Sequence, residues 1–189
     1  MNAVMQYLGS DFQSLKPIVQ EAHSGDIKLE GKVAVRRGWG LAWLIGAVLG
    51  MPRSNAQEDL IVFGSHTKTK MIWRRTFGDF DGIGLVGRGQ NVTEMTSFFE
   101  VVGPFFVEYF GPFRLHFKLS CEDGDLVYRL QEVRLGGIRL PSWLSPTVEA
   151  FESEQEGGYQ FGVRVVLPVL GRLIEYGGVM ELEHCVDLI

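Results

Sequence analysis

The chain has 189 residues, 46% of them hydrophobic and 12% aromatic, which is enough apolar material for one domain, residues 1–189, with a full core. The net charge of −5 argues against a nucleic-acid partner, because phosphate binding needs clustered Lys and Arg, and it weakens the case for docking on anionic lipid. Two cysteines, Cys121 and Cys185, are too few for a secreted disulfide scaffold. Because no signal peptide is recognised either, we expect a cytoplasmic protein with two free thiols. A disulfide bridge or a reactive pair is the alternative.

The first fifty residues predict helices on either side of one strand. Apolar residues recur at three- and four-residue steps over 4–23, which indicates a helix that Pro17 divides into two short ones. Residues 27–36 alternate between apolar and basic side chains, the pattern of a half-buried strand. The apolar run 41–51, which contains Trp43, favours a helix buried on most sides, either in the core or as a cavity wall or lid. It is too short to cross a bilayer, so no transmembrane segment is predicted.

From residue 59 onward the chain predicts strands and turns. Single strands are expected at 60–65 and 69–77, and hairpins at 113–135 and 159–182, with a bulge near Gln131 where the alternation changes phase. The aromatic-rich segment 92–110 is ambiguous, 138–146 is irregular, and 52–58 and 152–158 are polar enough to be exposed loops. These elements predict a mainly β (α+β) fold: a curved antiparallel or barrel-like sheet wrapped around one apolar helix, with an N-terminal helix.

Several segments carry a family resemblance that covers nearly the whole chain. They are YLGSDFQSLKPIVQEAH (7–23), TKMIWRRTFGD (69–79), EYFGP (108–112), LGGIRLPSWLSP (135–146) and YQFGVRVVLPVLGRLIEYGG (159–178). In this order they resemble an uncharacterised bacterial domain of unknown function, DUF family 4166. That family occurs alone or fused behind a saccharopine-dehydrogenase-like NAD(P)-binding domain. The resemblance implies no activity.

No motif assigns a reaction, a metal or a cofactor to the chain, so its status as an enzyme is open. The four histidines do not pair at metal-ligand spacing, and His66 and His116 are expected at the surface. No G-x-S-x-G elbow is present. A carboxylate such as Glu108 would act as an acid or base if it faced a closed cavity, whereas on a solvated strand face it would form an ordinary ion pair.

The ligand-binding candidates are aromatic and charged residues on predicted strands and loops. In the strand 69–77, Trp73 and Arg75 share one face and Arg74 the other, and the sequence does not decide which face points inward. An inward Arg75 would need a carboxylate or a lipid-like head group, because an isolated buried charge is very costly. Glu108, Arg129 and Tyr176 are candidates for the same interior, and Trp143 is either a rim aromatic or a loop anchor.

Three functions follow as hypotheses. The first is a non-catalytic binding module for an apolar or lipid-like small molecule, motivated by the Phe-rich interior and the lack of catalytic signatures. The second is an enzyme or a reductase-accessory domain with a polar pair, Glu108 with Arg75 or Arg129, in a β-lined cavity. The third is an interaction module whose exposed aromatics around 98–110 meet a protein partner.

Overall fold

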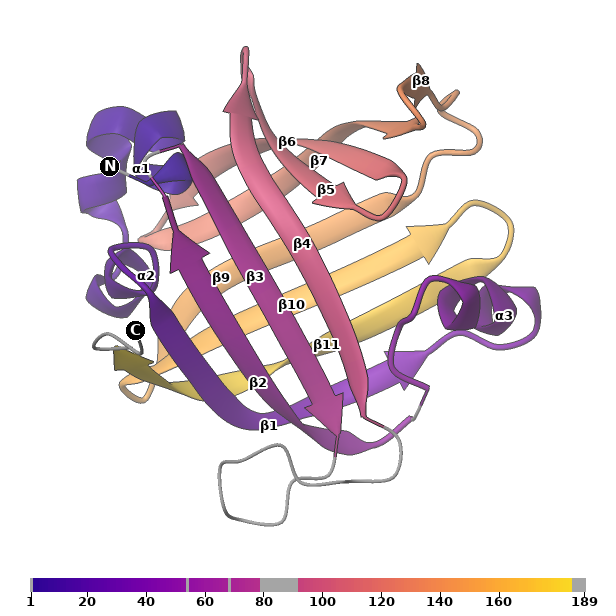
Figure 1. The fold of residues 1–189 in the computed structure, drawn as a ribbon, viewed down its shortest axis with the longest axis horizontal. Coiled ribbons are helices and arrows are strands. Elements are labelled where there is room, and N and C mark those ends of the chain that lie inside the picture. The colour runs from indigo at the N-terminus through magenta and orange to yellow at the C-terminus, as the bar shows by residue number, and fades with distance from the viewer. Residues whose placement is uncertain (1, 54, 68, 79–91, 185–189) are drawn as a thin grey trace.

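The computed structural model describes residues 2–53, 55–67, 69–78 and 92–184, and within these ranges ten strands form a closed antiparallel barrel (Figure 1). The strands are β1 (Ile27–Arg37), β2 (Gln57–His66), β3 (Lys70–Gly78), β4 (Thr93–Val102), β5 (Phe105–Phe110), β6 (Phe113–Glu122), β7 (Asp125–Leu135), β9 (Thr147–Gln155), β10 (Gly158–Leu167) and β11 (Gly171–His184). Their order around the barrel is β6-β5-β4-β3-β2-β1-β11-β10-β9-β7, and the pairing of β7 with β6 closes the ring. The short strand β8 (Ile138–Arg139) adds to the end of β7. The expected mainly β, barrel-like architecture is confirmed.

Alternation of side chains decides which residues fill the barrel. In β1 the predicted apolar face, Ile27, Leu29, Val33 and Val35, is buried. In β3 the buried residues are Met71, Trp73, Arg75 and Phe77, whereas Arg74 is exposed and pairs with Glu94 at 3.4 Å. The question that the sequence left open is therefore answered: Trp73 and Arg75 face inward.

Both predicted hairpins are present. The turn between β6 and β7 places Asp123 and Gly124 at φ 51° and 85°, the positive values that a tight two-residue turn needs. His116 pairs with Glu132 and Phe117 with Leu130, so Gln131 is the extra residue of the predicted bulge. In β11, a Cβ on Gly177 would lie 2.5 Å from the Phe161 carbonyl oxygen, so only glycine lets β10 approach this closely.

Short helices cover one end of the barrel. Residues 3–22, close to the predicted helical range 4–23, form α1 (Ala3–Leu8), the 3-10 helix η1 (Gly9–Ser14) and α2 (Pro17–Ala22), with Pro17 starting the last of them as expected. Their apolar residues are buried under the barrel end: Ala3, Val4, Phe12, Leu15, Val19 and Ala22. Lys16 joins this helical cap, residues 3–22, to the β6–β7 turn. Its backbone N–H donates to the Gly124 carbonyl at 2.8 Å, and its Nζ donates to Asp125 at 2.7 Å.

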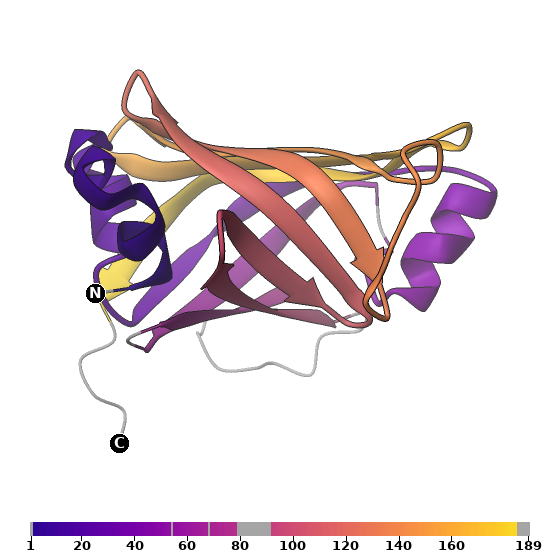
Figure 2. The same ribbon diagram turned by 90° about the horizontal axis from the view of Figure 1, so that it is seen from above.

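The apolar run 41–51 forms the helix α3 (Leu41–Val48), which lies at the opposite end of the barrel (Figure 2). Only Ala42 and Gly46 are buried within it, so the expectation that this helix is buried on most sides is wrong. The reason is that strand side chains already line the barrel interior, and the helix packs beside β11 at the rim. No helix in the described ranges has the length and apolar character needed to cross a membrane.

The structure resolves the ambiguous segment and confirms the expected exposed loops in part. Residues 92–110 form the hairpin β4–β5, with Gly103 in the turn at φ 58°. In the segment 152–158, Glu152 and Ser153 are buried at the end of β9, and only the turn residues 155–157 are exposed. The segment 52–58 begins with buried Pro52 and ends in β2, but Arg53 and residues 55–57 are exposed as expected. Polarity alone does not distinguish an inward carboxylate that has partners from a solvated loop.

Candidate functional site

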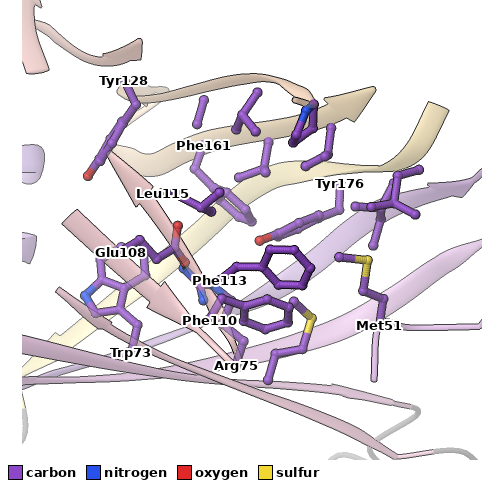
Figure 3. A pocket seen from close by; sticks show the side chains of 18 of the residues that line it. Met51, Trp73, Arg75, Glu108, Phe110, Phe113, Leu115, Tyr128, Phe161 and Tyr176 are labelled. Atoms are coloured by element: carbon purple, nitrogen blue, oxygen red, sulfur yellow. The ribbon is translucent and has the colours of Figure 1, made fainter. Parts of the chain in front are cut away.

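The barrel contains a cavity of about 230 Å³. Ten strands enclose a wider interior than the eight whose side chains fill a small barrel, so inward residues leave space between them. The cavity runs from Met51, beside α3, to Tyr128 near the capped end (Figure 3). Leu144 lines it and is also exposed, so the cavity opens at the α3 end. At about 30 Å³ per water, the space corresponds to a guest of on the order of ten non-hydrogen atoms.

Arg75 is a charged group in the middle of the mostly apolar wall, beside Glu108 (Figure 3). Its Nη1 donates a hydrogen bond to Ser97 Oγ at 3.0 Å, and its Nη2 lies 3.9 Å from Glu108 Oε1, too far for a hydrogen bond. The guanidinium also lies over the Trp73 ring, 5.4 Å from its centroid. A guanidinium has five N–H donors, so most of those of Arg75 have no acceptor among the described residues.

Tyr176 of β11 approaches the same part of the cavity from the opposite wall (Figure 3). Its ring packs edge-on against Phe77 and Phe161, and its hydroxyl forms no hydrogen bond with another described residue. Burial raises the pKa of Tyr176, so the hydroxyl keeps its proton at neutral pH and is a donor. Arg75 and Tyr176 thus present free donors to an apolar space.

A second polar cluster lies at the capped end of the cavity, around the buried carboxylate of Glu152. Its Oε2 lies 2.6 Å from Nε2 of the fully buried His23, and its Oε1 accepts from the Tyr128 hydroxyl at 2.6 Å. The Tyr159 hydroxyl is buried beside the same carboxylate without reaching hydrogen-bonding geometry. This cluster ties the helical cap to β7 and β9.

The charges of this cluster follow from its surroundings. Burial raises the pKa of Glu152, but His23 and the Tyr128 hydroxyl outweigh burial, so the pKa lies below its usual value and the carboxylate is ionised. Burial and then Glu152 raise the pKa values of Tyr128 and Tyr159 well above the usual range, so both remain donors. Next to them, burial and the charge of His23 lower the pKa of His66 to about 4.

The structure brings together four of the seven predicted ligand-binding residues. Trp73, Arg75, Glu108 and Tyr176 all line the cavity. The other three lie elsewhere. Trp43 is half exposed on α3, and its carbonyl accepts from Arg37 Nη2 at 2.9 Å. Arg129 is on the outer face of β7 in an exposed ion pair with Glu122, and Trp143 is exposed in the loop after β8. None of these three lines the cavity.

Sequence reasoning missed the cluster around Glu152. A signal was available, because Tyr128 and Tyr159 share the inward face of their strands with apolar residues, and a buried tyrosine hydroxyl needs a polar partner. The expected exposure of His116 is also wrong, and His66 is only partly exposed. His116 is buried, because the Phe105 ring packs edge-on against it at 5.4 Å, and both ring nitrogens of His66 are enclosed.

No group of three or more His, Cys, Asp or Glu side chains among the described residues is placed to hold a metal ion. Cys121 is a free cysteine, and Cys185 lies outside the described residues. What the cavity offers is apolar contact along its length, hydrogen-bond donors in its middle and an ionised carboxylate at its far end.

A family model described as a domain of unknown function (DUF4166) matches residues 15–180, most of the chain and nearly the whole barrel. The chain belongs to the DUF4166 family. No curated protein and no solved structure matches it significantly. The matched range of the DUF4166 domain includes α2 and every residue of both polar clusters, so the cavity and its polar groups lie within the family's own domain.

Proposed function

We propose that this DUF4166 domain is a non-catalytic binding module for a small amphipathic molecule. The apolar body of the guest lies along the cavity, and an oxygen-bearing head group accepts hydrogen bonds from Arg75 and Tyr176. The observation that carries the proposal is the buried Arg75, whose guanidinium donates one hydrogen bond to protein while the rest of its donors adjoin an apolar cavity. A buried guanidinium is strongly favoured to find acceptors, so a guest that supplies them gains affinity.

The neighbouring Glu108 narrows the class of head group. Arg75 and Glu108 together carry no net charge, and the pair is loose at 3.9 Å. A carbonyl, a hydroxyl or a carboxylic acid fits between them, because each supplies an acceptor to Arg75, and a hydroxyl or acid also donates to Glu108. We also propose that the protein is cytoplasmic and has no nucleic-acid partner, because of the composition and net charge of the chain.

The test is calorimetric titration with straight-chain alcohols and carboxylic acids of increasing length, together with native mass spectrometry of protein purified from cells. Arg75→Met should weaken the best ligand by roughly 10- to 100-fold, because a hydrogen bond to a charged group contributes about 1.5–3 kcal/mol. Arg74→Met is the matched control, since Arg74 is the adjacent residue on the exposed face. Leu115→Phe, which fills part of the cavity, should block long chains. If no member binds and nothing co-purifies, the proposal fails.

Catalysis is the second candidate, and the observation that favours it is the pairing of Tyr128 with the ionised Glu152 on the cavity lining. A protonated tyrosine and a carboxylate in a dry site are suited to proton transfer. Incubating the bound guest with protein and following its mass and retention time distinguishes the two functions. An unchanged guest favours binding alone, and a changed guest whose turnover stops in Tyr128→Phe favours catalysis.

A further inference from the structure

The open end of the barrel has an exposed apolar rim, formed by α3 with its preceding residues and by the connections 136–146 and 168–170. Its most exposed side chains are Trp39 (88%), Val48 (80%), Ile138 (77%), Trp143 (70%) and Val169 (105%). Three of the four tryptophans of the chain, Trp39, Trp43 and Trp143, are on this rim. Figures 1 and 2 show α3, β8 and the β10–β11 turn gathered at the same end of the barrel. Single exposed apolar residues are ordinary, but a contiguous group marks an interaction site.

Folding does not account for the rim. Val169 is fully exposed and has a φ of 64°, a left-handed conformation that β-branched residues rarely adopt. An asparagine or glycine would fit this turn better and would leave no apolar side chain in water. Backbone strain combined with full exposure points to a role for Val169 outside the fold.

The charge around the rim is positive, although the chain as a whole is acidic. The segments 37–53, 134–146 and 166–173 contain Arg37, Arg53, Arg134, Arg139 and Arg172 and no Asp or Glu. Arg37 is buried under α3, but the other four are at the surface or partly exposed. The nearest carboxylates are shared: Glu132 pairs with both Arg134 and Arg139, and Glu175 pairs with Arg36, Arg164 and Arg172.

A group of acidic residues lies at the capped end. The β6–β7 and β9–β10 turns there contain Glu122, Asp123, Asp125, Glu154 and Glu156. The net charge of −5 therefore does not describe the charge of the rim. The argument against docking on anionic lipid, which rested on that net charge, does not hold for this face. Charges act on a surface within about a Debye length, roughly 8–10 Å, so the distant acidic turns do not cancel the arginines at the rim.

We propose that this rim docks the barrel mouth on the surface of a membrane that contains anionic phospholipids. Tryptophan rings favour the head-group region, and arginines beside them are attracted to anionic lipid. A second copy of the chain is a poorer occupant, because pairing two rims would bring the arginine-rich segments together. The docked orientation places the cavity opening, where Leu144 is exposed, against the lipid. The proposal does not depend on whether the cavity holds a guest.

The test is co-sedimentation of the full chain with vesicles of phosphatidylcholine alone or mixed with phosphatidylglycerol, with tryptophan emission recorded on the same samples. Binding should require the anionic lipid, weaken at high salt and shift the emission to shorter wavelength, because three of the four tryptophans enter the interface. Trp39→Ala/Trp143→Ala should weaken binding at least tenfold. Arg53→Gln/Arg139→Gln should weaken it by roughly tenfold or more.

Matched controls separate the rim from the rest of the surface. Phe63→Ala removes an exposed aromatic residue from the barrel wall, and Arg129→Gln removes an exposed arginine near the capped end. Both should bind like the wild type, and circular dichroism should show all variants folded. The proposal is overturned if neither vesicle binds the protein, if neutral and anionic vesicles bind it equally, or if the rim variants bind like the controls. A dimer that sedimentation shows to be lost in Trp143→Ala would overturn it in favour of self-association.

Discussion

Replacing His66 by Asn should make the fold more resistant to mild acid. The pKa of His66 is about 4 in the folded protein, because of burial and the charge of His23, against 6.5 for an ordinary histidine. Between these values the unfolded chain binds more protons than the folded one, so stability falls as the pH drops from about 6.5 towards 4. Asp26 and Glu152, which also face this ring, act in the opposite direction and are already included in that pKa.

The size of the effect follows from the two pKa values. With 6.5 unfolded and about 4 folded, His66 costs the protein about 2 kcal/mol at pH 5 relative to pH 7.5, and about 3 kcal/mol at pH 4. Urea unfolding of the wild type and of His66→Asn at pH 7.5 and 5 measures the difference directly. The free energy of unfolding should fall by about 2 kcal/mol less in the variant.

Phe63→Ala, an exposed substitution that removes no titratable group, provides the control and should keep the wild-type fall between the two pH values. Glu152 does not disturb this comparison, because its pKa is lowered from 4.5, so its contribution to stability is lost only at pH values below about 4.5. If His66→Asn loses as much stability as the wild type, burial does not lower the pKa of His66 in the folded protein.

Three further changes test the packing of the barrel and its ends. Gly46→Ala should lower the free energy of unfolding by about 1–3 kcal/mol in urea titrations, because the new Cβ would lie 2.3 Å from Nη2 of the buried Arg37. Val169→Asn should raise the melting temperature, because the left-handed turn costs valine about 1–2 kcal/mol; an unchanged or lower value would show that the turn is not strained. Phe12→Ala should cost about 3–5 kcal/mol by the same urea titrations, since Phe12 is buried under the barrel end; a cost below 1 kcal/mol would mean that the cap contributes little to stability.

Local patterns were sufficient to predict most of the barrel. The strand β1 and the two hairpins alternate clearly, and the phase change near Gln131 identified a real bulge. What failed was the position of α3. An apolar helix at a barrel rim and one in a core have the same composition, so a segment such as 41–51 does not show whether its neighbours leave room inside.

The site was predictable only where local alternation of side chains was informative. The parity of β3 placed Trp73 and Arg75 on one face, but whether that face is inward depends on the pairing with β2 and β4, which is not local. Glu152 could not be recognised by itself, because its partner His23 lies 129 residues earlier in the chain. The loop that contains Trp143 gave no signal of its orientation, whereas Arg129 alternates with Tyr128 and Leu130, and this parity already placed it on the opposite face from them.

The pairing of β1 with β11 determines when the barrel can form. Ile27 pairs with His184, so the ring closes only after nearly the whole described chain has been synthesised. Until then β1 and β10 have open edges that invite pairing with other chains, and the helical cap lacks the Glu152 carboxylate until β9 emerges. Such long-range closure predicts slow folding for a chain of this size and a requirement for chaperones or low temperature during its production.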